Sequence, residues 1–398
     1  MSRTYSAALP FVLAMTMALG PLSIDAYLPA FPSMAEALGT GIGEVSRSLS
    51  VYIFGLAVGQ LVGGPLSDRI GRKRVMYAGL VIFIAACVGV SQAASLDSLL
   101  LFRALQAFGG GWVMVLVPAL VRDQVQGREA AKLFSMIGLI MVLAPGIAPS
   151  IGSALLAVGG WHVIFWFLAI YALCLIPIQT IFVLRHSQDG NANHHADTLL
   201  TRYRAVFSTR PALPFIALQA FGFSVMMLFI THASFIYQAH FGRSESVFSL
   251  LFGANIVIML LVNLTNRALL NRFSSRQILI TCLSVQFVGV LLLLLMTWTH
   301  ASVWLFLPAM MITIGAQGGV VPNNQACFME YFEHHGGTAA SLLGACQFGI
   351  AGVLSALSTL LPETLGFVVA SMFASSLVCM IVIIAALKPL PWQRRQVN

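Results

Sequence analysis

Hydrophobic runs that contain no Asp, Glu, Lys or Arg alternate with short charged segments along the whole chain. The ten longest runs are 4–24, 48–67, 75–96, 104–121, 133–184, 211–242, 246–266, 277–329, 336–362 and 364–387. Each holds about 18 residues or more, which lets a helix cross the hydrocarbon core of a bilayer. Two of them are too long for one crossing and are interrupted, at Gly159–His162 and near Thr297–Ser302. The pattern therefore predicts twelve membrane-spanning helices.

The longest hydrophilic segment, Arg185–Arg210, leaves six predicted helices on either side. Its Asp189–Asn193 stretch is typical of a flexible linker, and Leu199–Phe207 is typical of a short helix on the membrane surface. Two bundles joined in this way usually hold a transport site between them near the bilayer midplane. We therefore expect an all-α membrane protein with an N-terminal six-helix bundle at residues 1–184, a cytoplasmic linker at 185–211 and a C-terminal six-helix bundle at 212–398.

Composition excludes an ordinary soluble domain, because only 9% of the residues are charged and 59% are hydrophobic. Soluble proteins average about a quarter charged residues. The net charge of +8 does not indicate a nucleic-acid partner, since the basic residues are spread in small groups between the apolar runs. On a twelve-helix topology, 18 of the 21 basic residues fall on one side, which the positive-inside rule assigns to the cytoplasm. Both termini are then cytoplasmic.

Cysteine and histidine give no sign of a metal site or a disulfide framework. The six cysteines lie within apolar runs or at the end of one, and no C-x-x-C spacing occurs. Acidic and histidine residues gather in two cytoplasmic loops, at Glu330–His335 and at His194–His195, but we expect no metal there. We expect no cofactor either.

A dense basic segment, Gly64–Arg74, joins the second and third predicted helices. Glycine permits a sharp turn, and an acid among basic residues can pair with one of them or face a helix N-terminus. We expect a cytoplasmic gating loop; the alternative is an ordinary basic hairpin. The residues expected to act in gating are Gly64, Asp68, Arg69, Gly71 and Arg72, with Asp123 after the fourth helix as a partner for Arg72. The matching loop of the second half, Asn266–Arg276, keeps three basic residues but has no acid or glycine.

Asp25 is the one acidic residue that interrupts a predicted membrane helix. An ionisable side chain inside a membrane span is costly, and it is a candidate for proton or ion coupling by default. The alternative is that Asp25 merely ends the first helix at the outer surface, since about 21 residues make about 32 Å of helix.

Arg103 lies near the outer end of the fourth predicted helix. One interpretation is an arginine that snorkels to the lipid headgroups. However, Arg103 and Asp25 lie at a similar depth in the same half, and we expect them to approach each other, directly or through water, and to couple proton exchange. Arg103, Gln106 and Gly110 also share one helix face.

Further polar and helix-breaking residues lie within the spans. Pro145, Pro149 and Gly152 predict a kinked fifth helix that packs closely on a neighbour, as opposed to a merely irregular helix. Polar side chains at Gln219, His232, Gln286, Gln317 and Gln347 are more often local hydrogen-bonding groups between helices than ligand contacts. The residues that we expect to line a substrate cavity are Tyr27, Tyr52, Gln60, Gln106, His232 and Gln347.

These motifs together resemble the major facilitator superfamily, within its bicyclomycin and chloramphenicol resistance group of drug:proton antiporters. The resemblance extends over nearly the whole chain and implies the major facilitator fold. Some glycines of the family pattern are replaced here, at Ala107, Ala144, Ala148 and Ser153. The matching segments are Pro21–Pro29, Leu49–Tyr52, Gly59–Gln60, Gly64–Arg74, Arg103–Gln106, Ala148–Ser153, Pro322–Asn323 and Gly337–Gly344.

The resemblance implies an exporter of the bacterial inner membrane that expels small amphipathic drugs in exchange for protons by alternating access. Its partners would be the drug, protons and the lipid bilayer, and it would act as a monomer with the proton gradient as its energy source. The first alternative is a facilitator or proton symporter for a sugar or other small metabolite. The second is a polytopic membrane enzyme, but no Gly-x-Ser-x-Gly, His-Glu-x-x-His or paired-acid motif is present.

Overall fold

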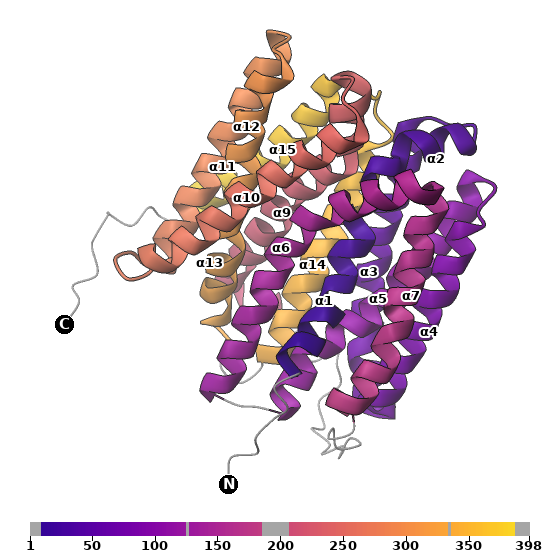
Figure 1. Ribbon diagram of the computed structural model, residues 1–398. Coiled ribbons are helices and arrows are strands. Elements are labelled where there is room, and N and C mark those ends of the chain that lie inside the picture. Colours follow the sequence, from indigo (N-terminus) through magenta and orange to yellow (C-terminus); the bar gives the residue numbers. More distant parts are fainter. Residues whose placement is uncertain (1–8, 125–126, 185–206, 333–335, 387–398) are drawn as a thin grey trace. The chain divides into compact units, whose positions relative to one another are not determined.

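The computed structural model describes residues 9–124, 127–184, 207–332 and 336–386, and every regular element within these ranges is helical (Figure 1). Ten helical segments are long and apolar enough to cross a membrane, and two shorter apolar helices lie at Leu143–Gly159 and Leu342–Ser358. The prediction of an all-α membrane fold is therefore confirmed. The two predicted interruptions also occur, because helices end at Gly159 and Trp298 and the next ones begin at Trp161 and Val303.

The chain divides into two compact units, residues 1–196 and 197–398. The division falls in the predicted linker, most of which, including His194, His195 and Leu199–Val206, lies outside the described residues. The elements of the first unit are α1 (Leu9–Asp25), η1 (Leu28–Ala30), α2 (Phe31–Ala37), α3 (Ile42–Ile70), α4 (Arg72–Ser91), α5 (Leu96–Gln124), α6 (Gly127–Gly159), α7 (Trp161–Gln179) and η2 (Thr180–Leu184). Those of the second are η3 (Arg210–Ala212), α9 (Leu213–Ser234), η4 (Phe235–His240), α10 (Glu245–Leu269), α11 (Ser275–Trp298), α12 (Val303–Gly315), α13 (Gln317–Met329), α14 (Gly336–Ser358) and α15 (Leu365–Ala386).

The first crossing is longer than its charge-free run and extends well past Asp25. Helix α1 continues through a two-residue turn into η1 and α2, so that one span covers Leu9–Ala37. Pro29 and Pro32 follow Asp25, and because proline has no N–H, regular α-helical hydrogen bonding is interrupted here. Helix α1 itself ends at Asp25, one residue after the predicted end at Ile24, and the candidate span continues beyond it to Ala37.

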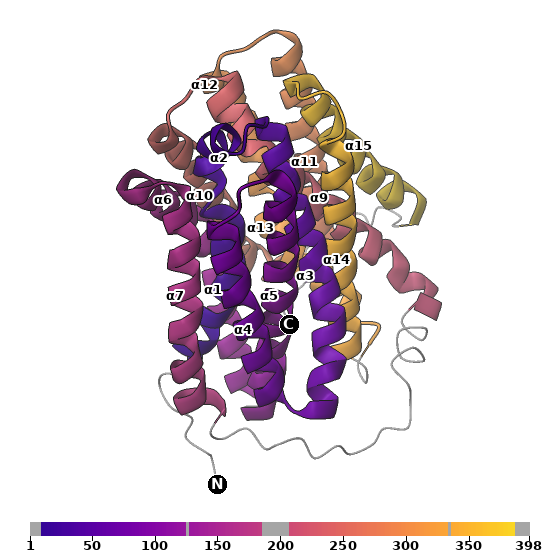
Figure 2. The ribbon, with the colours of Figure 1, turned by 90° about the vertical axis from the view of Figure 1, so that its right-hand side faces the viewer.

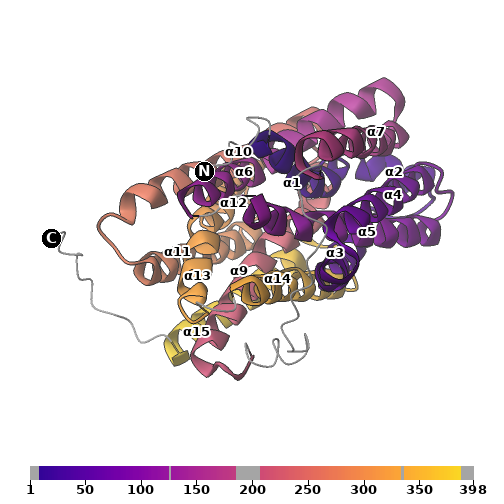
Figure 3. The same ribbon diagram turned by 90° about the horizontal axis from the view of Figure 1, so that it is seen from below.

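Glycines allow α5 to pack closely between α3 and α4, and both neighbours lie beside it in Figures 2 and 3. A methyl group added at Gly63 of α3 would lie 2.9 Å from Cα of Trp112 on α5. One added at Gly79 of α4 would lie 2.9 Å from the carbonyl oxygen of Gly109. Small residues at helix interfaces let backbones approach in this way, since the bilayer offers no hydrophobic drive between helices.

We predict that Gly63→Ala lowers the thermal stability of the protein and that Gly64→Ala does not lower it. Alanine favours a helix by about 0.5–1 kcal/mol over glycine, but forced overpacking costs about 1–3 kcal/mol. The methyl group at Gly64 would meet only Val115 Cγ2, at 3.7 Å. Thermal unfolding in detergent should therefore show a lower midpoint for Gly63→Ala and an unchanged or higher one for Gly64→Ala. Equal midpoints for the two variants would contradict close α3–α5 packing.

Candidate functional site

Asp25 lies at the end of α1, inside the first membrane span. It follows Leu9 by about 24 Å of helix, and the candidate span continues through η1 and α2 to Ala37. The side chain is 1% exposed, and its Oδ1 atom has no hydrogen-bond partner in the described part of the chain. Asp25 thus ends α1, as the alternative expected, but it is buried in protein, and its depth in the bilayer stays a prediction.

The main chain beside Asp25 is in direct contact with α6. A methyl group at Gly152 would overlap the carbonyl oxygen of Ala26, so no larger residue fits without moving a backbone. Pro145 and Pro149 lie within α6 one to two turns before this contact. The fifth crossing thus packs on the interruption in the first one at the residue next to Asp25. Close packing at Gly152 is retained although neighbouring positions carry alanine or serine.

Arg103 lies in α5 and is completely buried. Its guanidinium lies over the rings of Tyr27 and Tyr52, at 4.2 and 4.1 Å from the ring centroids. Its Nη1 donates to Oε1 of Gln106 at 2.6 Å, and its Nη2 donates to the carbonyl oxygen of Ser23 at 3.1 Å. The cation is held by aromatic faces and neutral oxygens, which excludes an arginine that snorkels to the headgroups.

Neighbouring side chains complete what we call the Arg103 cluster, whose members are Ser23, Asp25, Tyr27, Tyr52, Cys87, Arg103, Gln106 and Phe165. The hydroxyls of Tyr27 and Ser48 are 3.1 Å apart, which joins the interruption in the first crossing to α3. Gln106 Nε2 donates to Sγ of Cys87 at 3.0 Å, which reaches α4. Phe165 of α7 lies 5.7 Å from Tyr27, centroid to centroid. Five crossings of the first unit therefore contribute to one cluster.

Within the described residues, no ion pair joins Asp25 to Arg103. They are linked instead through the main chain of α1, because Arg103 bonds to the carbonyl of Ser23, two residues before Asp25. The ion pair that the described residues do form, Arg47 to Glu44 at 3.9 Å, lies at the partly exposed start of α3. A shared role of Asp25 and Arg103 in proton coupling stays a prediction.

The predicted cavity residues separate into two groups. Tyr27, Tyr52 and Gln106 belong to the Arg103 cluster, where all three are fully buried. His232 and Gln347 belong to the second unit. Gln60 lies half-buried on α3 beside Gly111, outside the Arg103 cluster.

Amide side chains join the helices of the second unit. Asn323 Nδ2 donates to Oδ1 of Asn266 at 2.7 Å, from α13 to α10. Asn324 Nδ2 donates to Oε1 of Gln219 at 2.8 Å, and Gln219 Nε2 donates to Oε1 of Gln347 at 2.7 Å. These bonds connect α13, α9 and α14 without any charge. Gln219 and Gln347 thus form the local hydrogen bonds that sequence reasoning favoured.

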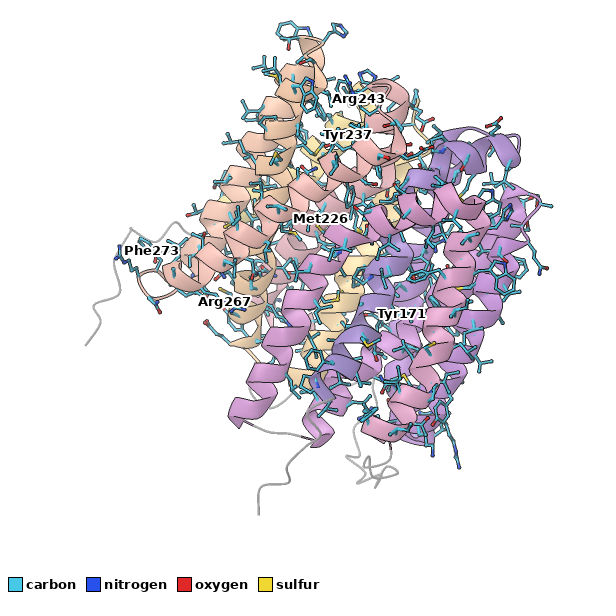
Figure 4. The ribbon with its side chains drawn as sticks, viewed as in Figure 1. Tyr171, Met226, Tyr237, Arg243, Arg267 and Phe273 are labelled. Atoms are coloured by element: carbon cyan, nitrogen blue, oxygen red, sulfur yellow. The ribbon has the colours of Figure 1, made fainter. Side chains whose placement is uncertain are left out.

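Two further polar contacts stabilise α9. His232 Nε2 lies 2.9 Å from Oγ of Ser358 on α14. The carbonyl oxygen of Gly222 accepts from Nε2 of Gln286 at 3.3 Å and from Nε2 of Gln317. Just after α9, in η4, the hydroxyl of Tyr237 accepts from Nδ2 of Asn255 at 3.3 Å; Tyr237 is labelled in Figure 4.

The predicted gating loop forms the turn between α3 and α4. Gly71 separates the two helices with a φ of 94°, a conformation that favours glycine. Arg72 Nη1 donates to Oγ of Ser67 at 2.6 Å, and that hydroxyl donates to the carbonyl oxygen of Gly64 at 2.6 Å. Arg69 is exposed. The side chains of Asp68 and Asp123 lie outside the described residues, so the predicted pairing of Arg72 with Asp123 stays a prediction.

Sequence reasoning identified Tyr27, Tyr52, Gln106, Gln219 and Gln347 but missed other neutral members of both networks. Ser23, Cys87 and Phe165 lie in apolar runs whose composition carries no sign of a buried cation nearby. Asn255, Asn266 and Asn324 could have been found as polar interruptions of apolar runs. Among the described residues, no three His, Cys, Asp or Glu side chains are grouped as a metal site would require.

Comparison with known proteins places these features in a family. The family model of the Major Facilitator Superfamily matches residues 13–356. A bicyclomycin resistance protein homolog of Haemophilus influenzae is 26% identical over 341 residues, which cover 85% of each chain. Multidrug resistance protein D of Escherichia coli is 29% identical over 369 residues, covering 92% of this chain and 91% of that one.

A third relative, a chloramphenicol resistance protein of Pseudomonas aeruginosa, is 28% identical over 353 residues, 87% of this chain and 82% of its own. Among solved structures, a D-xylose-proton symporter matches with a TM-score of 0.75 over 94% of this chain and 97% of its own. Its sequence identity is 16%, so it supports the fold and not a substrate.

We predict that the aromatic face of Tyr52 matters and that its hydroxyl does not. Tyr52→Phe keeps the ring over Arg103 and removes an oxygen that has no hydrogen-bond partner in the described part of the chain. Tyr52→Leu removes the ring and should lower the free energy of unfolding by about 2 kcal/mol, the value of a desolvated cation–π contact. Chemical denaturation in detergent measures both variants. Equal losses for Phe and Leu would argue against the cation–π contact.

Proposed function

The chain belongs to the major facilitator superfamily, and we propose that it exports small amphipathic drugs in exchange for protons by alternating access. It is a multi-pass membrane transporter and not an enzyme. The proposal needs no cofactor, because the proton gradient supplies the free energy. Relatives with resistance names, at 26–29% identity over most of both chains, support a drug as the substrate.

The observation that carries proton coupling is the placement of Asp25. The carboxyl lies at the end of α1 within a candidate span, is 1% exposed and keeps one oxygen without a hydrogen-bond partner in the described part of the chain. Desolvation disfavours the charged form of any carboxyl, whereas a nearby cation favours it, so a change in either one changes proton occupancy. A group in this position can therefore take up a proton in one state of the transporter and release it in another.

Arg103 supplies a fixed positive charge on the helix that packs against this region. Its contact with the carbonyl of Ser23 links the position of α5 to that of α1. Gly152 places α6 against Ala26, on the other side of Asp25 along the chain. We infer that a shift of α5 or α6 between inward and outward states changes the surroundings of Asp25. That change would connect helix movement to proton exchange.

The proposal also assigns a place to the gating loop and a topology to the chain. We assign the loop of Gly64, Asp68, Arg69, Gly71 and Arg72, with Asp123, to the cytoplasmic end of the first unit. The 18 basic residues predicted on that side support a bacterial inner-membrane protein with both termini cytoplasmic. We further propose that it acts as a monomer.

A sugar transporter is the alternative function, and the structural match to a D-xylose-proton symporter keeps it open. The direction in which the substrate moves relative to the proton separates the two. In acidified inverted vesicles, an exporter that exchanges drug for protons dissipates the gradient when drug is added outside. A proton symporter for sugars dissipates it when neutral sugars are loaded inside, because sugar and proton leave together.

We predict that Asp25→Asn abolishes drug-induced dissipation of the proton gradient in inverted vesicles while the protein still inserts and folds. The neutral amide has the same shape but cannot carry the proton. Asp97→Asn is the matched control, because Asp97 is exposed in the first turn of α5, and its response should equal that of the parent. Full proton exchange and drug resistance with Asp25→Asn would rule out Asp25 as the coupling group.

A further inference from the structure

A cavity of about 220 Å³ lies in the second unit, lined in part by the loop Asn266–Arg276 and by Glu330 and outside the Arg103 cluster. It is formed where α9 begins, α10 and α11 meet, and α13 ends. Figure 4 labels Phe273, one of its lining residues, and Arg267 on the nearby end of α10. The residues that matter for its chemistry are Phe215, Ser274, Ser275, Arg276, Glu330 and Tyr331.

The cavity lies at the ends of three candidate membrane spans. The spans that surround it end at Leu269 and Met329 and begin at Ser275, so the lining residues lie at their last or first turns. This is the side that the basic residues assign to the cytoplasm. Phe215 and Tyr331, whose centroids are 6.0 Å apart, supply the aromatic surface typical of a membrane interface.

Two opposite charges line this cavity without forming an ion pair. Within the described residues, no contact of 4.0 Å or less joins Arg276 to Glu330. The Nε atom of Arg276 is buried and has no hydrogen-bond partner in the described part of the chain. A buried donor of this kind is costly unless something satisfies it. The cavity thus presents a donor for an anion and an acceptor for a cation.

The surroundings of each charge favour different groups. Ser275 stands beside Arg276 in the first turn of α11, whereas the hydroxyl and N–H of Ser274 already donate to Oε1 of Gln277. Phosphate is a suitable ligand for a guanidinium at the start of a helix. Glu330, at the end of α13, carries an acceptor for an ammonium group. A pure anion would leave Glu330 unpaired, and a pure cation would leave Arg276 unpaired.

We propose that this cavity binds a zwitterionic phosphate–ammonium group, with the phosphate at Arg276 and the ammonium at Glu330. The shared chemistry is phosphoethanolamine, either as a phospholipid headgroup or as the free compound. The volume is below the range of about 300–1,000 Å³ that drug-sized ligands occupy, so a headgroup fits where a whole drug does not. The site is independent of the proposed transport function.

The test measures lipid retention by the full-length protein with native mass spectrometry, after reconstitution with phosphatidylethanolamine, phosphatidylcholine or phosphatidylglycerol. The parent should retain phosphatidylethanolamine best. Phosphatidylcholine has no N–H donor for Glu330, and phosphatidylglycerol has no cation. Arg276→Gln should reduce phosphatidylethanolamine retention by roughly tenfold, the effect of one lost charge-assisted bond. Glu330→Gln should reduce phosphatidylethanolamine retention but leave phosphatidylglycerol retention unchanged.

Arg272→Gln is the matched control, because Arg272 is an exposed neighbour that does not line the cavity. It should retain lipid as the parent does. If Arg276→Gln folds poorly, Arg276→Lys serves as the second variant. It keeps the positive charge and should retain part of the phosphatidylethanolamine binding. Competition with free phosphoethanolamine identifies the source of the ligand. If the free compound displaces the bound lipid, the site is open to the soluble compound; if it does not, the membrane supplies the ligand. Equal retention of the three lipids by the parent, or equal losses for Arg276→Gln and Arg272→Gln, would overturn the proposal.

Discussion

A buried positive charge without a counterion is the constraint on which the first unit depends. A guanidinium in the interior is costly unless its donors are satisfied and its charge meets electron-rich groups. Arg103 meets these demands in large part: Nη1 and Nη2 donate to Gln106 and to the carbonyl of Ser23, and two tyrosine faces meet the charge, while Nε has no hydrogen-bond partner in the described part of the chain. Because these partners come from α1, α3, α5 and the turn after α1, the charge determines how those helices sit against one another.

The second unit is held together by a different kind of polar interaction. Its helices are joined by neutral amides, from Asn266 through Asn323 and from Asn324 through Gln219 to Gln347. Neutral amides satisfy each other without the desolvation cost of a charge, so such a network is insensitive to pH. This contrast favours the first unit for the candidate proton-exchange group, whereas the amide network of the second unit carries no charge.

Prediction from the sequence succeeded for the features that the lipid bilayer itself constrains. A span must be apolar and long enough to cross, and backbone groups in lipid must bond within their own helix, so hydrophobic runs predict helices. Both long runs were divided where the structure divides them, at Gly159–His162 and Thr297–Ser302. At Asp25 the same rule predicted where α1 ends, but not that a candidate span continues through η1 and α2 to Ala37.

The sequence by itself determined the fold class, the helices and their interruptions, since these depend on local hydrophobicity and on residues such as proline and glycine. It also identified Asp25 and Arg103, because an ionisable residue in an apolar run is visible without any structure. Only the tertiary structure decided what surrounds them. Tyr52 stacks on Arg103, Ser23 supplies a carbonyl and Gly152 abuts Ala26 because helices distant in sequence meet there. Contacts of that kind depend on helix packing in three dimensions, which hydrophobic patterning does not encode.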